Sequence, residues 1–133
     1  MAYYLRLYCV TLVAFLAVDI IWLGLVARTF YRQYLGFLLA PGTHWAAAIS
    51  VYLLLILGIL VFAVLPGLRD NSLKTALARA ALFGFIAYGT YDLTNLATVR
   101  DWPLVVTIVD MAWGTMLSTM VSCVGFLAGR WIH

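Results

Sequence analysis

Four long apolar stretches divide the chain, and each is long enough to cross a lipid bilayer. A membrane-spanning helix needs about 20 mostly apolar residues, because it rises about 1.5 Å per residue through a hydrocarbon core of about 30 Å. The stretches cover residues 8–26, 44–65, 75–98 and 104–127. The chain is 66% hydrophobic and only 10% charged, which excludes an ordinary soluble globular protein. We therefore predict an all-α fold, a four-helix transmembrane bundle that forms a single integral membrane domain over residues 1–133.

The first connection, residues 27–43, is the longest and carries a helical pattern of its own. Its apolar side chains recur at helical spacing among Arg and Gln, at Tyr31, Tyr34, Leu35, Leu38 and Leu39. This spacing predicts a short interfacial amphipathic helix after the first span, ended by Pro41-Gly42. The helix could cover a cavity as a lid or only anchor the chain, and the sequence leaves both interpretations open. A second breaker pair, Pro66-Gly67, predicts the end of the second span.

The net charge of +3 indicates topology rather than nucleic-acid binding, so no nucleic-acid partner is expected. Five basic residues flank the side shared by the N-terminus, the second loop and the C-terminus: Arg6, Arg69, Lys74, Arg79 and Arg130. Three flank the other side: Arg28, Arg32 and Arg100. Because cytoplasmic loops of membrane proteins are enriched in Lys and Arg, this distribution predicts that both termini are cytoplasmic.

Three of the five acidic residues, Asp19, Asp92 and Asp110, lie inside apolar stretches, without Lys or Arg in the same interiors. A charged residue at the centre of a membrane helix costs about 2.5–3.5 kcal/mol, and such residues usually mark ligand, ion or proton sites. With both termini inside, these three carboxyls lie roughly 12, 9 and 9 Å from the outer boundary, at about 1.5 Å per residue. We therefore predict one layer of carboxyl groups in the outer half of the bilayer.

Further polar and aromatic residues share this layer. Along residues 75–98, helical spacing places a polar and aromatic stripe on one face, which consists of Gly84, Tyr88, Tyr91, Asp92 and Asn95. We predict a ligand-binding site lined by Asp19, Trp22, Tyr88, Tyr91, Asp92, Asn95, Asp110 and Trp113. Below it, Gly114, Ser118 and Ser122 are spaced by four residues, a pattern that lets membrane helices pack closely.

The chemistry of this layer fits several functions. The leading hypothesis is binding of a small amphiphile, lipid or cation, and whether the protein also modifies that ligand stays open. The alternatives are a proton-coupled small-molecule transporter, a non-enzymatic subunit of a larger membrane complex, and a purely structural role for the polar groups. A homodimer is also open. Two cysteines and one His near the layer make no metal site, so no metal is expected, and no cofactor or catalytic residue is assigned. Membrane lipids are the expected surroundings.

Two strings of residues resemble a known family. They are Tyr91-Asp92-Leu93-Thr94-Asn95 and Val109-Asp110-Met111-Ala112-Trp113-Gly114. Together with residues 19–24 and 30–32, they make the chain similar over its whole length to a family of small bacterial four-helix membrane proteins of unknown function. The resemblance implies a four-helix fold in a bacterial inner membrane, and it implies no activity.

Overall fold

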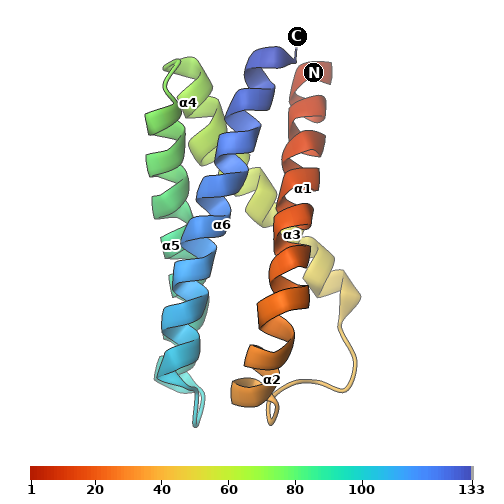
Figure 1. Cartoon of the computed structure of the whole chain (residues 1–133), viewed down its shortest axis with the longest axis vertical. Coiled ribbons are helices and arrows are strands. Elements are labelled where there is room, and N and C mark those ends of the chain that lie inside the picture. The colour runs from red at the N-terminus through yellow and green to blue at the C-terminus, as the bar shows by residue number, and fades with distance from the viewer. Residues whose placement is uncertain (133) are drawn as a thin grey trace.

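The computed structural model describes residues 1–132 as a bundle of four long helices that run alternately in opposite directions (Figure 1). The first consists of α1 (Ala2–Trp22), a π-helical segment (Leu23–Ala27) and α2 (Arg28–Leu35). The second consists of α3 (Trp45–Ile59), another π-helical segment (Leu60–Val64) and α4 (Leu65–Arg69). The third is α5 (Leu73–Thr98) and the fourth is α6 (Leu104–Trp131). The described residues contain no strand, and the predicted all-α four-helix fold is confirmed.

Three of the four helices are long and apolar enough to cross a membrane: Ala2–Leu35, Trp45–Arg69 and Leu104–Trp131. The third helix, α5, has 26 residues and is the most polar of the four. It lies beside α6 along its length, and the two chain termini lie at the same end of the bundle (Figure 1). The membrane character expected from the sequence is therefore confirmed for three helices.

The predicted amphipathic helix exists as α2, but it is not a separate interfacial element. It continues from α1 through the π-helical segment, so that one helix of 34 residues runs from Ala2 to Leu35. The helix ends before Pro41-Gly42, which lie in the following loop. A π-helical turn changes the direction of the side chains without breaking the backbone hydrogen bonds, and such turns are frequent at functional sites.

The predicted end of the second helix at Pro66-Gly67 is wrong, because α4 continues through both residues to Arg69. Proline has no N–H, and its ring clashes with the carbonyl four residues earlier in a regular α-helix. Here the π-helical segment Leu60–Val64 directly precedes α4, and its wider turn relieves that clash. Ser72 caps the start of α5, since its hydroxyl accepts a hydrogen bond of 3.2 Å from the Thr75 amide.

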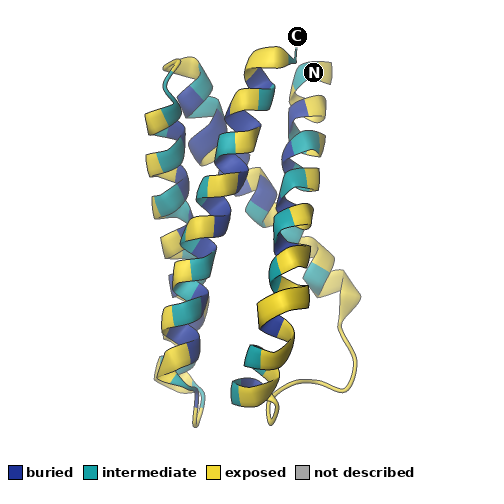
Figure 2. Ribbon diagram, viewed as in Figure 1, coloured by how far each residue is buried: buried dark blue, intermediate teal, exposed yellow. Residues whose placement is uncertain are grey.

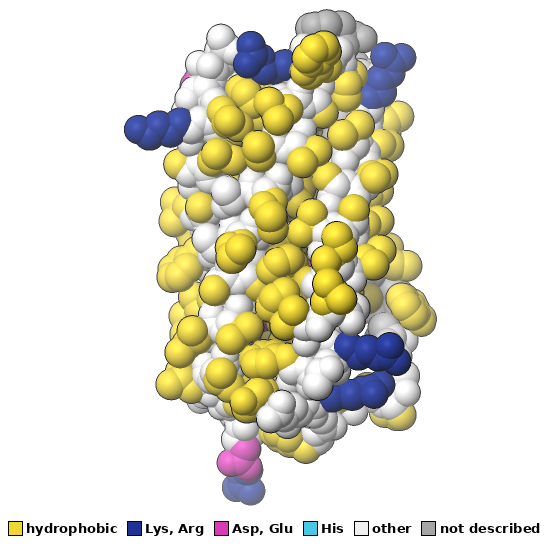
Figure 3. Space-filling view, viewed as in Figure 1, with side chains coloured by type: hydrophobic (Ala, Val, Ile, Leu, Met, Phe, Trp, Pro, Cys, Tyr) yellow, Lys and Arg dark blue, Asp and Glu magenta, His cyan; other side chains and the backbone are white. Residues whose placement is uncertain are grey.

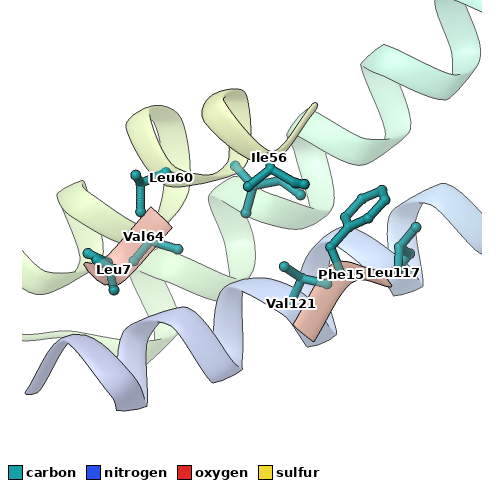
Figure 4. Close-up of a cluster of buried hydrophobic side chains, with 8 residues drawn as sticks. Leu7, Phe15, Ile56, Leu60, Val64, Leu117 and Val121 are labelled. Carbon is teal, nitrogen blue, oxygen red and sulfur yellow. The ribbon is translucent and has the colours of Figure 1, made fainter. Parts of the chain in front are cut away.

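The apolar core fills the half of the bundle nearer the termini. Figure 4 shows most of its side chains pointing toward one another from α1, α3, α6 and the second π-helical segment. Its buried members are Leu7, Phe15, Ile56, Ile59, Leu60, Val64, Leu117 and Val121. In Figure 2 the buried residues face the bundle interior, and in Figure 3 apolar side chains cover the flank while Lys and Arg gather toward its two ends. This distribution is the one that lipid contact requires.

Small residues bring α5 and α6 into close contact. A Cβ added at Gly84 would collide with the backbone oxygen of Gly114, and a Cβ added at Gly114 would collide with the Tyr88 ring. Further along, the Ser122 hydroxyl donates a hydrogen bond of 3.2 Å to the backbone oxygen of Ala76. This close approach fixes the register of α5 against α6, and it sets the polar stripe of α5 beside Asp110.

Candidate functional site

A pocket of about 270 Å³, which we call the carboxyl pocket, lies in the half of the bundle away from the termini. It is bordered by α1, α2, α3, α5, α6 and the turn between α5 and α6. Seven of the eight predicted site residues line it: Asp19, Trp22, Tyr88, Tyr91, Asp92, Asp110 and Trp113. The eighth, Asn95, is half-buried outside the lining, where it lies within hydrogen-bonding reach of the Tyr91 hydroxyl.

Asp92 has the most unusual surroundings of the three carboxyl groups. Its side chain is completely buried, and neither carboxyl oxygen has a hydrogen-bond partner within the described structure. The carboxyl group of Asp110 lies within hydrogen-bonding reach of it, but two carboxylates have no proton to donate, so neither Asp92 oxygen receives a hydrogen bond. A buried polar group that lacks its hydrogen bonds destabilises a protein by about 1–3 kcal/mol. Asp92 therefore lowers the free energy of unfolding of the bundle. This favours a role for Asp92 other than holding the helices together.

Asp110 is held by the amphipathic helix. The Tyr31 hydroxyl donates a hydrogen bond of 2.5 Å to one carboxyl oxygen of Asp110, across 79 residues of sequence. The Trp22 indole lies within hydrogen-bonding reach of the same hydroxyl. Since Tyr31 is on α2 and Asp110 is on α6, this bond fastens the end of the first helix over the carboxyl pocket.

Asp19 lies near hydrogen-bond donors on two other helices. The Tyr52 hydroxyl on α3 and the Trp113 indole on α6 both lie within hydrogen-bonding reach of its carboxyl group. Trp113 also stacks on Trp22, with ring centroids 4.2 Å apart and an angle of 7° between the planes. These contacts join α1, α3 and α6 around Asp19. The two Trp side chains therefore line the pocket and also hold α1 against α6.

Trp102, in the turn between α5 and α6, closes another side of the pocket. Its indole N–H donates a hydrogen bond of 3.1 Å to the Thr107 hydroxyl, and its ring meets Tyr91 edge to face at 5.9 Å. The Thr107 hydroxyl in turn lies 3.4 Å from the backbone oxygen of Asp92, to which it donates. The turn is thereby tied to the same stretch of α5 that carries the unpartnered carboxyl group.

Sequence reasoning missed three polar pocket residues: Tyr31, Tyr52 and Trp102. Tyr52 is surrounded by apolar residues along α3 and belongs to no periodic stripe of polar residues. Helical spacing therefore does not identify it as a site residue. Tyr31 belongs to a recognised helical pattern, but nothing in that pattern indicates that it reaches α6. A usable signal was present for Tyr52, because a phenol deep in an apolar span is itself a polar group that needs a partner.

A second hollow of about 300 Å³ lies between α3 and α5 and adjoins the carboxyl pocket. We call it the apolar groove. Its own walls are Ala48, Val51, Leu55 and Ala87, and it shares Tyr52, Tyr88, Tyr91 and Asp110 with the carboxyl pocket. The side chain of Val51 is 50% exposed, so the groove reaches the outer surface of the bundle. In a membrane this surface faces lipid.

The carboxyl pocket has a one-sided charge. Its lining contains three Asp residues and neither Lys nor Arg. Arg28 and Arg32 line a neighbouring hollow, which meets the carboxyl pocket at Leu23, Tyr31 and Leu39. Among residues 1–132, no three His, Cys, Asp or Glu side chains are grouped closely enough to hold one metal ion. The arrangement can therefore accept hydrogen bonds and positive charge from an organic group better than it can chelate a metal.

The Tyr31→Phe substitution is expected to loosen α2 without unfolding the bundle. A hydrogen bond to a carboxylate contributes about 1.5–3 kcal/mol, so amide exchange in residues 28–39 should become roughly ten to a hundred times faster. Hydrogen exchange followed by mass spectrometry measures this directly. Tyr34→Phe, on the same helix, serves as the matched control and should exchange as the wild type does. Unchanged exchange in Tyr31→Phe would show that the bond does not hold α2 in place.

A family model described as predicted membrane protein (DUF2177) matches residues 4–127, and the chain belongs to this family. The match confirms the resemblance seen in the sequence, and it carries no assigned activity. Searches of curated proteins and of solved structures find no match to the chain.

Proposed function

We propose that this member of the family binds a small amphiphile within the membrane. Its polar head would occupy the carboxyl pocket, and its apolar tail would lie in the apolar groove between α3 and α5. The observation that carries the proposal is that the two hollows meet at the same four side chains, Tyr52, Tyr88, Tyr91 and Asp110. A polar pocket joined to an apolar groove matches the two halves of an amphiphile.

The sizes and surroundings of the two hollows support this function. Ligand pockets usually measure about 300–1,000 Å³ and are mainly apolar with a few well-placed polar groups. The carboxyl pocket and the groove are each near the lower end of that range, at about 270 and 300 Å³, and together they fall within it. A groove that reaches the flank of the bundle would let the ligand arrive from the bilayer without passing through water.

The membrane placement that goes with this function has four spans. The termini lie at the same end of the bundle, which requires an even number of crossings, and α5 lies beside α6 along its length (Figure 1). We propose that α5 also spans the membrane, beside the three helices that are apolar enough to do so, and we place both termini on the cytoplasmic side of a bacterial inner membrane by the positive-inside rule. The carboxyl pocket then lies in the outer half. A reporter fused to the C-terminus that works only in the cytoplasm should be active, and an inactive one would reverse the orientation.

Filling the groove should expel the tail. In Ala48→Phe the new ring would project into the apolar groove, whereas Ala47, the preceding residue of α3, is exposed and lines neither hollow. Lipids extracted from the gently purified protein should include one defined amphiphile, reduced several-fold in Ala48→Phe and retained in Ala47→Phe. Equal retention in the two variants would remove the groove from the binding site.

A further inference from the structure

We infer that the head group bound in the carboxyl pocket is a protonated amine with N–H donors. The inference rests on the proposed function and names the class of amphiphile that the site recognises. Three observations carry it: the missing hydrogen-bond donor at Asp92, the surplus of carboxyl groups with Asp110 between pocket and groove, and the aromatic walls.

The first observation concerns hydrogen bonds. Asp92 is buried on the wall of the pocket, and neither of its carboxyl oxygens receives a hydrogen bond, because the side chain within reach of it is another carboxyl group, that of Asp110. A carboxylate only accepts hydrogen bonds, so what the site lacks is a donor. An ammonium group brings up to three N–H donors, whereas a quaternary ammonium brings none. The geometry therefore favours a primary or secondary amine over a quaternary one.

The second observation concerns charge. The carboxyl groups of Asp92 and Asp110 lie within hydrogen-bonding reach of each other, and no Lys or Arg lines the pocket. Two neighbouring carboxylates repel each other, and a cation placed between them relieves that repulsion. An anionic head group would add to the repulsion. Asp110 also borders the apolar groove. The tail of an amine bound at Asp110 could therefore extend directly into the groove.

The third observation distinguishes an organic cation from a metal ion. No three His, Cys, Asp or Glu side chains of residues 1–132 are grouped to chelate a metal, and the walls between the carboxyls are aromatic. In the stacked pair Trp22 and Trp113 each ring covers one face of the other, and both rings line the pocket together with Tyr88. Aromatic faces attract organic cations by about 0.5–2 kcal/mol, and they offer little to a metal that needs oxygen ligands.

A series of probes with one tail tests the head-group chemistry. We would titrate dodecylamine, dodecyltrimethylammonium, dodecanol and dodecanoate into the wild-type protein in zwitterionic nanodiscs, and follow tryptophan emission. Empty nanodiscs correct for partition into lipid. A hydrogen bond to a charged group contributes about 1.5–3 kcal/mol, so dodecylamine should bind at least about ten times more tightly than each of the other three probes. Equal binding of dodecylamine and either dodecyltrimethylammonium or dodecanol would overturn the inference.

Asp92→Asn and Asp101→Asn are the matched variants for this series. Asp101 lies exposed in the turn between α5 and α6 at a φ of 59°, a conformation that Asn also tolerates. Asp92→Asn should reduce the affinity for dodecylamine at least about tenfold, toward that of dodecanol, whereas Asp101→Asn should bind as the wild type does. An Asp92→Asn protein with unchanged affinity would overturn the inference. The comparison among probes in the wild type does not depend on how the variants fold.

The same experiment separates the two proposals. If dodecylamine and dodecanol both bind saturably with the same affinity, the amine inference fails and amphiphile binding stands. If no tailed probe binds saturably, the proposed function fails as well. Methylamine, which has no tail, is the last probe. If methylamine binds as tightly as dodecylamine, the proposal that the ligand is an amphiphile is overturned, and the ligand is an amine without a tail.

Discussion

Gly84→Ala is expected to lower the free energy of unfolding of the bundle by about 3 kcal/mol or more. Overpacking a tight interface usually costs about 1–3 kcal/mol, and the cost rises when the obstacle cannot rotate away. Here the added Cβ would meet the backbone oxygen of Gly114 and the side chain of Ser118. The only relief is for α5 to move away from α6, which also separates Asp92 from Asp110. Reversible unfolding in mixed micelles measures the change.

The control for this prediction is Gly24→Ala. Gly24 lies in the first π-helical segment, and a Cβ added there would have no heavy atom within 4 Å. Alanine is favoured over glycine in a helix by about 1 kcal/mol, so this variant should match or slightly exceed the wild type in stability. Similar losses in the two variants would show that the α5–α6 contact is not as close as described.

Asp92→Leu is expected to raise the free energy of unfolding by about 1–3 kcal/mol and to abolish ligand binding. The substitution removes two buried oxygens that receive no hydrogen bond. The folded state gains stability because it no longer contains buried polar atoms without a hydrogen bond. The adjoining pocket leaves space for the larger side chain. Gains in stability that remove function are typical of binding sites that are strained or unsatisfied in the free protein.

Asp110→Leu is the matched substitution with the opposite sign. It would remove the acceptor of the Tyr31 hydroxyl, leaving that hydroxyl unpaired, and should lower the free energy of unfolding by about 1–3 kcal/mol. The contrast between the two Asp residues is the useful result. If Asp92→Leu destabilises the bundle as much as Asp110→Leu does, Asp92 holds the helices together, and its place in a binding site loses its main support.

Much of the fold could be predicted from the sequence because lipid imposes simple rules. An apolar stretch of about 20 residues predicts a membrane-spanning helix. The depth of an Asp side chain in the bilayer follows from the number of residues between it and the end of that helix. That counting placed Asp19, Asp92 and Asp110 in one layer, and the structure brings them to one pocket. Helix boundaries are harder to predict next to π-helical turns. A proline usually ends a regular α-helix, but the helix continues through Pro66 because a π-helical segment precedes it.

The parts of the site that could not be predicted depend on how the helices rotate and meet. Asn95 shares a face with Asp92 but lies about one turn further along α5, outside the pocket lining. Tyr31 reaches the site only because α2 continues α1 without a break, and a bond across 79 residues leaves no trace in local spacing. Likewise, which carboxyl group lacks a partner is a property of the assembled bundle and not of its helices.

The three carboxyl groups therefore have separate roles in the carboxyl pocket. Asp19 and Asp110 have hydrogen-bond donors of the protein within reach, and they position the walls of the pocket. Asp92 has only the carboxyl group of Asp110 within reach, and it is the group to which a ligand would donate. This division distinguishes a prepared binding site from a polar cluster whose hydrogen bonds are all internal.

The most direct test of ligand binding at Asp92 is native mass spectrometry of the gently purified wild type beside Asp92→Asn and Asp101→Asn. We predict that the wild type and Asp101→Asn retain one defined amphiphile and that Asp92→Asn has lost it. Fragmentation of the released ligand would then identify its head group. A wild-type protein that is empty, or the same adducts on all three proteins, would contradict the binding site at Asp92.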